Sequence, residues 1–190
     1  MPTPPHGWNS WESIMREALR ESCLAAEAGE VPVGAVVINA HGEVVGKGHN
    51  ASVATSDPTG HAEIIALRKA AITTGNYRLN GCVLVVTLEP CLMCAGAIIH
   101  ARVDGVVYGT PDPRAGAVIS RLDGLELAMH NHTPWHAGKI LEEECATQLR
   151  DFFASKRTFH KKRQNTTLNA PEKTPECEDK HLPDTARAGM

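Results

Sequence analysis

Aromatic residues are scarce in this sequence. They make up 4% of the 190 residues, although hydrophobic residues together reach 42%, so aliphatic side chains must form most of the core. No apolar run approaches the roughly 18 residues that a membrane-spanning helix needs. The N-terminal segment Met1–Gly7 lacks the basic and apolar regions of a signal peptide. We therefore expect no membrane association and a cytoplasmic location.

The sequence also lacks a strong excess of charge of either sign. Its formal net charge is −3, so any binding of nucleic acid must come from a local basic patch. Its six cysteines do not indicate the disulfide framework of a small secreted protein. Only Cys91 and Cys94 lie close together, and this spacing is typical of a metal site or a redox site.

Helical and extended patterns alternate along most of the chain. Asn9 is the expected N-cap of the first helix, and Gly29 is expected to end it. The patterns predict further helices near residues 61–74, 91–100 and 139–156, and strands near 31–39, 43–48, 82–87 and 103–108. Strands that alternate with helices predict a layered α/β domain.

Three segments differ in composition. Residues 1–8 are expected to be a flexible leader, and residues 9–157 to form one folded domain. Residues 158–190 are rich in Lys, Glu, Thr, Pro and Asn without hydrophobic periodicity. Such a segment cannot bury enough apolar surface to fold alone, so we expect a disordered C-terminal tail.

Two short motifs carry the chemistry, and each lies at the start of a predicted helix. Cys91 and Cys94 are three residues apart, so on one helical turn they face the same way. The partial positive charge of a helix N-terminus favours the thiolate form that binds zinc. His61 supplies a third ligand. Three protein ligands with an open fourth position are typical of a catalytic zinc site.

Glu63 follows His61 by two residues and is the expected proton carrier beside this metal. A zinc ion lowers the pKa of its bound water from about 15.7 to about 7, which supplies hydroxide near neutral pH. The combination H-x-E followed by P-C-x-x-C is the known signature of zinc nucleobase deaminases, in which the glutamate is the general acid and base. The sequence therefore predicts hydrolytic replacement of an exocyclic amine on a nucleobase.

Two other interpretations of the cysteine pair are weaker. A structural zinc site would need a fourth ligand, and no further Cys or His lies in a comparable motif. A thioredoxin-like redox pair would not require His61 or Glu63.

Longer runs around these motifs carry a family resemblance over about residues 10–157. They are Val31–Ala35, Asp57–Ile64, Asn76–Leu79, Thr87–His100, Tyr108-Gly109 and Asp112. With them the chain resembles the bacterial tRNA adenosine deaminases of the cytidine/deoxycytidylate deaminase superfamily. The resemblance implies a three-layer cytidine-deaminase-like fold, in which helices flank a central mixed β-sheet.

The resemblance also implies an activity and its partners. The activity is conversion of adenosine to inosine at the wobble position of a tRNA, typically an arginine tRNA. Zinc-bound hydroxide would attack C6, Glu63 would shuttle protons, and ammonia would leave. The implied cofactor is one Zn²⁺ per subunit, and the implied partners are the tRNA anticodon stem-loop and a second copy in a homodimer.

Several substrate-binding residues are implied by the same resemblance. They are Asn50, Val31, Ala62, Asp112 and Asn131. Asn50 matches the position that hydrogen-bonds the bound nucleoside, Val31 a pocket wall, and Asn131 an Asn-His pair near the RNA. Prolines flank Asp112 where the family has a basic or small residue before it, so loop 110–114 is expected to touch RNA differently.

Two competing functions stay open at this point. A deaminase of a free base or nucleotide, such as guanine, cytosine or deoxycytidylate, would use the same zinc chemistry, because the motif does not encode specificity. A non-catalytic RNA-binding subunit would be expected to have lost the glutamate, and Glu63 is present.

Overall fold

The structure is a computed structural model that describes the backbone of residues 1–168 and the side chains of residues 1–157. Met1–Ser155 form one compact unit, and Lys156–Met190 are assigned to a second. Both predicted motifs lie in the first unit. Within the described residues, no helix is long and apolar enough to cross a membrane.

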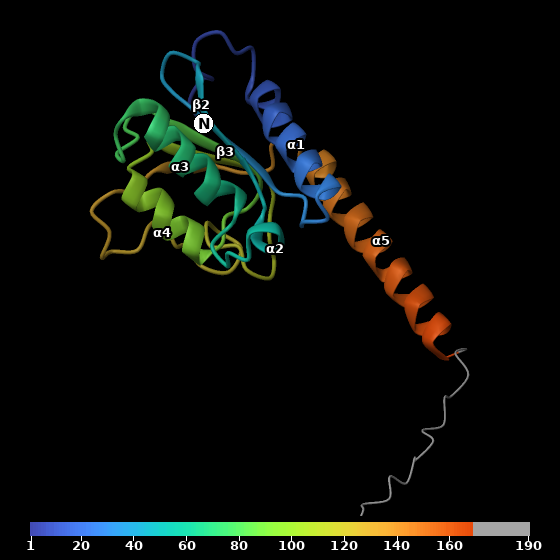
Figure 1. The fold of residues 1–190 in the computed structure, drawn as a ribbon. Helices are drawn as coiled ribbons and strands as arrows, with labels where there is room; N and C mark the ends of the chain where they lie inside the picture. The colour runs from blue at the N-terminus through green and yellow to red at the C-terminus, as the bar shows by residue number, and fades with distance from the viewer. Residues whose placement is uncertain (169–190) are drawn as a thin grey trace, which may run out of the picture. The chain divides into compact units, whose positions relative to one another are not determined.

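A five-stranded mixed sheet forms the centre of the first unit (Figure 1). Its order is β2-β1-β3-β4-β5. The strands are β1 (Gly34–Ile38), β2 (Val44–His49), β3 (Val83–Leu88), β4 (Gly105–Thr110) and β5 (Trp135–Ala137). β1 pairs antiparallel with both β2 and β3, whereas β3, β4 and β5 are parallel. The predicted mixed sheet is confirmed.

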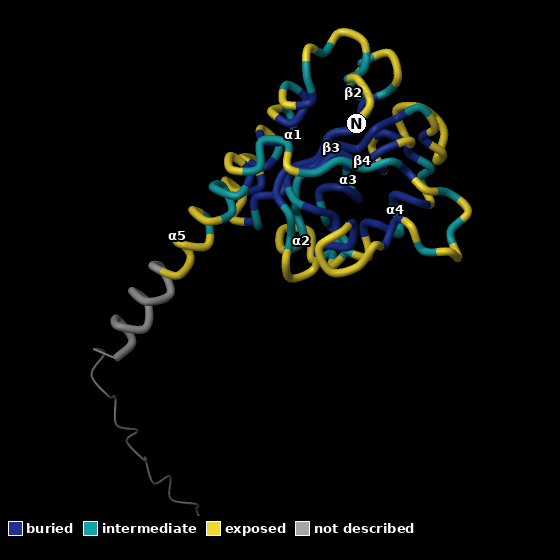
Figure 2. Tube along the Cα trace, turned by 180° about the vertical axis from the view of Figure 1, so that it is seen from behind, coloured by how far each residue is buried: buried dark blue, intermediate teal, exposed yellow. Residues whose placement is uncertain are grey.

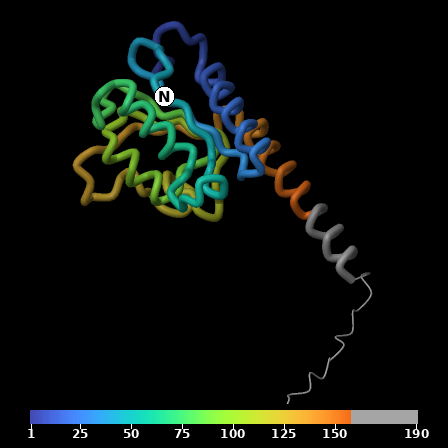
Figure 3. Tube along the Cα trace, in the orientation of Figure 1, coloured from blue at the N-terminus to red at the C-terminus, as the bar shows by residue number. Residues whose placement is uncertain are grey.

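Helices cover both faces of this sheet. The elements are α1 (Trp11–Glu27), α2 (Ser52–Thr55), α3 (Ala62–Thr74), α4 (Leu92–Ala101) and α5 (Glu142–Leu168). Successive side chains of a strand point to opposite faces. Val37 and Leu84 therefore pack in one core with α3 and α4, whereas Val36 and Val85 pack in another with α1. The buried strands run between these helices (Figures 2 and 3), and the three-layer α/β fold is confirmed.

The N-cap of the first helix lies one residue later than predicted, so α1 begins at Trp11. Ser10, not Asn9, is the N-cap: its backbone is extended, and its side chain accepts a hydrogen bond from Ser13 N at 3.3 Å. The Ser13 hydroxyl donates to Ser10 O at 2.6 Å. Ser10 and Ser13 therefore satisfy each other in the first turn, and the predicted N-cap at Asn9 was wrong by one residue.

Strand β5 and helix α2 were not predicted, because both are too short to show periodicity. β5 depends on its pairing with β4 and on the packing of the Trp135 ring. A β-carbon at Gly105 would overlap the Trp135 ring, so the glycine leaves room for this ring beside β4. The Trp135 ring also packs edge-on against Trp11, with ring centroids 5.6 Å apart.

The two ends of the chain add detail to the predicted boundaries. Residues 1–8 contain no helix or strand, but Trp8 Nε1 donates to Gly42 O and Trp11 Nε1 donates to Pro2 O, both at 2.8 Å.

The last helix was predicted at 139–156 and runs instead over Glu142–Leu168. It begins later because Lys139 and Leu141 have positive φ. It ends later because no Pro or Gly interrupts residues 157–168. Residues 169–190 lie outside the described residues. The flexibility predicted for residues 1–8 and the disorder predicted for the C-terminal tail therefore stay predictions.

Close contact between β1 and α1 makes a prediction about stability. A β-carbon at Gly34 would overlap Ala18 O and Ser22 N of α1. Gly34→Ala is therefore expected to lower the free energy of unfolding by about 3 kcal/mol, measured by chemical denaturation. Gly96→Ala on α4 is the matched control, since nothing lies within 4 Å of a β-carbon there. Equal stability of both variants would contradict the described seating of α1.

Candidate active site

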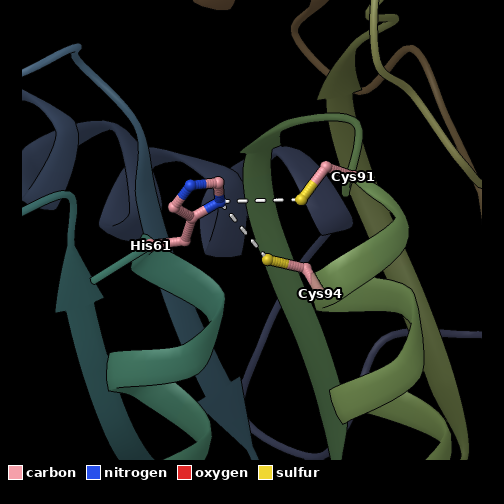
Figure 4. A group of neighbouring side chains, drawn as sticks. All are labelled: His61, Cys91 and Cys94. Carbon is pink, nitrogen blue, oxygen red and sulfur yellow. Dashed lines mark hydrogen bonds between the residues drawn. The ribbon is translucent and has the colours of Figure 1, made fainter. Parts of the chain in front are cut away.

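The two motifs meet because α3 and α4 lie side by side and begin at the same end of the sheet (Figure 4). His61 is the N-cap of α3, and Cys91 is the N-cap of α4. Both have extended backbones, and neither side chain makes a capping hydrogen bond. Their side chains turn toward each other instead, with Cys94 following in the first turn of α4.

The spacing of the three side chains fits a zinc ion. His61 Nδ1 lies 3.6 Å from Cys91 Sγ and 3.5 Å from Cys94 Sγ. A tetrahedral zinc with ordinary bond lengths holds a nitrogen and a sulfur ligand about 3.6 Å apart. No fourth ligand joins this cluster within the described part of the chain. The donor set and its geometry therefore match the predicted three-ligand site.

The electrostatics of the cluster favour a thiolate at one of the two cysteines, Cys91, whereas the hydrogen bond with Cys91 and burial raise the pKa of Cys94. A hydrogen bond with Cys94 lowers the pKa of the Cys91 thiol to about 4, and His61 contributes in the same direction. The pKa of His61 is raised, chiefly by its hydrogen bond with Cys91. Thiolate is the form in which cysteine binds zinc, so Cys91 is suited to this role at neutral pH.

Glu63 lies in the first turn of α3 and is only 4% exposed. Burial is the main cause that raises the pKa of its carboxyl above the usual range. A carboxyl group whose pKa is raised holds a proton more readily than an ordinary glutamate does, which suits a general acid and base. Glu63 is not one of the three clustered ligand residues. Its position suits the predicted proton carrier.

Three of the predicted substrate-binding residues surround the start of α3. Asn50 Oδ1 accepts a hydrogen bond from Ala62 N at 3.0 Å, and Asn50 N donates to Val33 O at 3.1 Å. Val31 packs, partly buried, against the core that contains Ala62. Asn50 thus satisfies the first amide of α3, a structural role that its place in the sequence did not show.

Asp112 and Asn131 lie in different places. Asp112 N donates to Glu89 Oε2 at 3.0 Å, and this contact keeps Asp112 near the strand end that leads to Cys91. Asn131 O accepts from Arg102 Nη1 at 2.9 Å, just beyond the C-terminal end of α4. Ten residues of helix separate that end from Cys91, a rise of about 15 Å. Within one chain, the structure does not bring Asn131 to the cluster.

Glu89 was missed by sequence reasoning. It is 2% exposed and immediately precedes Pro90-Cys91. Burial opposes ionisation, but hydrogen bonds from Ser120, Ile119 and Asp112 outweigh it and lower the pKa of the carboxyl. A glutamate between an apolar strand and a proline gives no periodic signal, and its donors come from a loop more than twenty residues later.

Known proteins share both the motif and the fold. Residues 9–110 match the family model of the cytidine and deoxycytidylate deaminase zinc-binding region. A tRNA-specific adenosine deaminase of Haemophilus influenzae is 46% identical over 146 residues, which cover 77% of this chain and 84% of that protein. A structure solved in studies of A-to-I editing by tRNA:A34 deaminases is 40% identical, with a TM-score of 0.70. The match covers 72% of this chain and 99% of that chain.

A guanine deaminase of Nitrosomonas europaea shares the fold but little sequence. Its TM-score is 0.67 at 24% identity, over 79% of this chain and 88% of that one. At this identity the likeness supports the architecture alone. The family match and the relative from Haemophilus influenzae support more: the chain belongs to the tRNA-specific adenosine deaminases, within the zinc-binding cytidine and deoxycytidylate deaminases.

Proposed function

We propose that this protein converts adenosine to inosine at the wobble position of a tRNA, with an arginine tRNA as the expected substrate. The observation that carries the proposal is the cluster of His61, Cys91 and Cys94 with buried Glu63 beside it. The A34 deaminase structure with which the chain shares 40% identity supports the choice of substrate.

The residues of the cluster divide the work of a hydrolytic deamination. His61, Cys91 and Cys94 would hold one zinc ion per subunit. When bound, the ion supplies the Lewis acidity that makes a water reactive near neutral pH. Glu63 takes a proton from the attacking water and delivers protons to the ring nitrogen and the leaving amine. Adenosine and water thereby give inosine and ammonia.

Asn50 and Val31 are proposed to orient the nucleoside at the start of α3. Asn50 is already fixed by its hydrogen bonds to Ala62 N and Val33 O. Its carboxamide NH₂ can donate to a ribose or base without further ordering of the side chain. Val31 supplies apolar surface at the same end of the sheet.

Two exposed cations near the cluster are proposed to contact RNA phosphates. Arg114 and Arg121 lie in the loop that follows β4, and the isolated bridge between Gly116 and Cys91 joins this loop to the zinc-ligand segment. Arg114→Ala and Arg121→Ala are each expected to raise KM for an anticodon stem-loop several-fold. Each should also lower the slope of log KM against log salt by about one. The measurement is steady-state kinetics at four salt concentrations.

The control for these variants is Arg20→Ala on α1, which covers the other face of the sheet. It also removes an exposed arginine, so it reports any general effect of charge. An unchanged salt slope in both loop variants would show that these arginines do not contact phosphates.

We infer that the protein forms homodimers. Apolar side chains are exposed at the start of α4 and in the loop after β4, two segments that the bridge between Cys91 and Gly116 joins: Leu92, Met93, Ile119 and Leu122. Sedimentation equilibrium would test the dimer. A cytoplasmic location also stays a prediction.

The test of the proposed function is an inosine assay. Zinc-loaded protein is incubated with an arginine tRNA anticodon stem-loop and, separately, with guanine, cytidine, deoxycytidylate and adenosine. We expect inosine at the wobble position and no turnover of the free compounds. Turnover of a free compound with an inert stem-loop would keep the zinc chemistry and replace the substrate.

A further inference from the structure

Glu89 is a buried carboxylate enclosed by one loop of residues 111–121 (the 111–121 loop). Its Oε1 accepts hydrogen bonds from three consecutive backbone amides, those of Val118, Ile119 and Ser120, at 3.1, 2.8 and 2.9 Å. Its Oε2 accepts from Asp112 N at 3.0 Å and from the Ser120 hydroxyl. A single side chain thus holds both ends of the loop.

The residues next to Glu89 in the chain, Pro90 and Cys91, also contact the 111–121 loop. Cys91 follows Glu89 by two residues, and Ala117 N donates to Pro90 O at 2.8 Å. An isolated bridge pairs Cys91 with Gly116. A β-carbon at Gly116 would overlap the Glu89 carboxylate, so loop and carboxylate are in close contact. Displacement of the loop would therefore change its distance from the cluster.

Glu89 does not have the arrangement of a second proton carrier. Five donors already point at its two oxygens. Its side chain is 2% exposed. A carboxylate whose acceptor sites are used by backbone amides fixes those amides in place.

The 111–121 loop carries groups that suit a polyanionic substrate. Arg114 and Arg121 are exposed, and both follow residues that Glu89 fixes directly. Arg114 N in turn donates to Asp112 Oδ1 at 2.9 Å, which continues the ordered turn outward from the carboxylate. The orientation of this cationic surface thus depends on one buried acceptor.

We propose that Glu89 is a positioning residue for RNA binding: it fixes the 111–121 loop against the cysteine-bearing segment and so sets the loop's cations relative to the target base. This inference rests on the proposed function. It assigns to Glu89 a role in substrate affinity and none in proton transfer.

Glu89→Gln tests the proposal because it changes one acceptor into a donor without changing the size of the side chain. The remaining oxygen is expected to face the three amides of Val118, Ile119 and Ser120. The new NH₂ group can then donate to the Ser120 hydroxyl, but it faces Asp112 N without accepting its hydrogen. The arm of the loop at Asp112 should therefore loosen more than the arm at Ser120.

Three measurements on Glu89→Gln separate positioning from a general structural effect. Hydrogen–deuterium exchange is followed in peptides that cover the 111–121 loop, zinc content is measured by elemental analysis, and KM and kcat are measured on the stem-loop. We expect about tenfold faster exchange at Asp112, unchanged zinc, a KM raised about tenfold and a kcat within about threefold of the parent. Glu30→Gln is the matched control, since Glu30 is 4% exposed and bonds Ala54 N, outside the loop.

Unchanged exchange in the 111–121 loop, or a loss of kcat at constant KM, would overturn the proposal. Ser120→Ala serves if Glu89→Gln does not fold, because it removes only the hydroxyl donor. It should raise loop exchange and KM two- to threefold, about the effect of one weak hydrogen bond, and no change in exchange would contradict the proposal. Exchange needs no substrate. If the parent protein makes no inosine, the proposed function fails while exchange still decides whether Glu89 fixes the loop.

Discussion

Glu63→Gln is expected to lower kcat on an anticodon stem-loop by about three orders of magnitude while zinc content stays at the parental level. The amide cannot take a proton from water or return one to the leaving amine, and general acid–base catalysis of this kind contributes about 10²- to 10⁴-fold. The fold should tolerate the change, because the carboxyl is 4% exposed and burial already disfavours its charge. Steady-state kinetics on the stem-loop, with zinc determined on the same sample, make the measurement.

Glu30→Gln controls for the loss of a carboxyl group at equal burial, since Glu30 is also 4% exposed. It should retain kcat within about threefold, because Glu30 bonds Ala54 N and is not part of the metal cluster. Loss of zinc together with activity in Glu63→Gln would mean that the carboxylate supports the metal site and does not carry protons.

Cys91→Ser is expected to weaken zinc binding at least about 100-fold and to abolish deamination. Even groups that only orient a zinc ligand change affinity by 10- to 100-fold, so loss of a thiolate ligand should cost no less. A 100-fold loss of affinity removes about 2.7 kcal/mol of the stabilisation that bound metal gives the folded state. The melting temperature in excess zinc should therefore fall, and it should converge with that of the parent when a chelator is added.

Cys23→Ser is the control, because Cys23 is exposed on α1 and lies outside the cluster. It should keep both zinc content and the zinc-dependent rise in melting temperature. Full zinc occupancy in Cys91→Ser would refute the assignment of this residue as a ligand.

The parts of the site that could be predicted from the sequence are those fixed by local geometry. Cys91 and Cys94 share a face because they lie one helical turn apart, and His61 immediately precedes another helix start. These local features predicted that the three residues are metal ligands, without any knowledge of the sheet. The nearly unbroken apolar run at 82–87 likewise predicted a central strand, and β3 is buried between β1 and β4.

The parts that could not be predicted depend on residues far apart in the chain. Strand β5 has three residues, and it pairs with β4 where Gly105 admits the Trp135 ring. Glu89 accepts hydrogen bonds from backbone amides more than twenty positions later in the chain. The position of Asn131 at the C-terminal end of α4 follows from a contact with Arg102. No periodicity encodes such contacts, because each joins segments that only the folded sheet brings together.

The alternation of side chains along β1 and β3 has a consequence for how this protein can change. One set packs with α3 and α4, which carry the ligands, and the other set packs with α1. Substitutions in the second core can alter thermal stability without moving a metal ligand, whereas substitutions in the first reach the helices that hold the ligands. Thermal stability and the geometry of the ligand-bearing helices can therefore vary separately. A search for variants of higher thermal stability is best confined to the core beneath α1. A search for a new base preference is best directed at the core beneath α3 and α4.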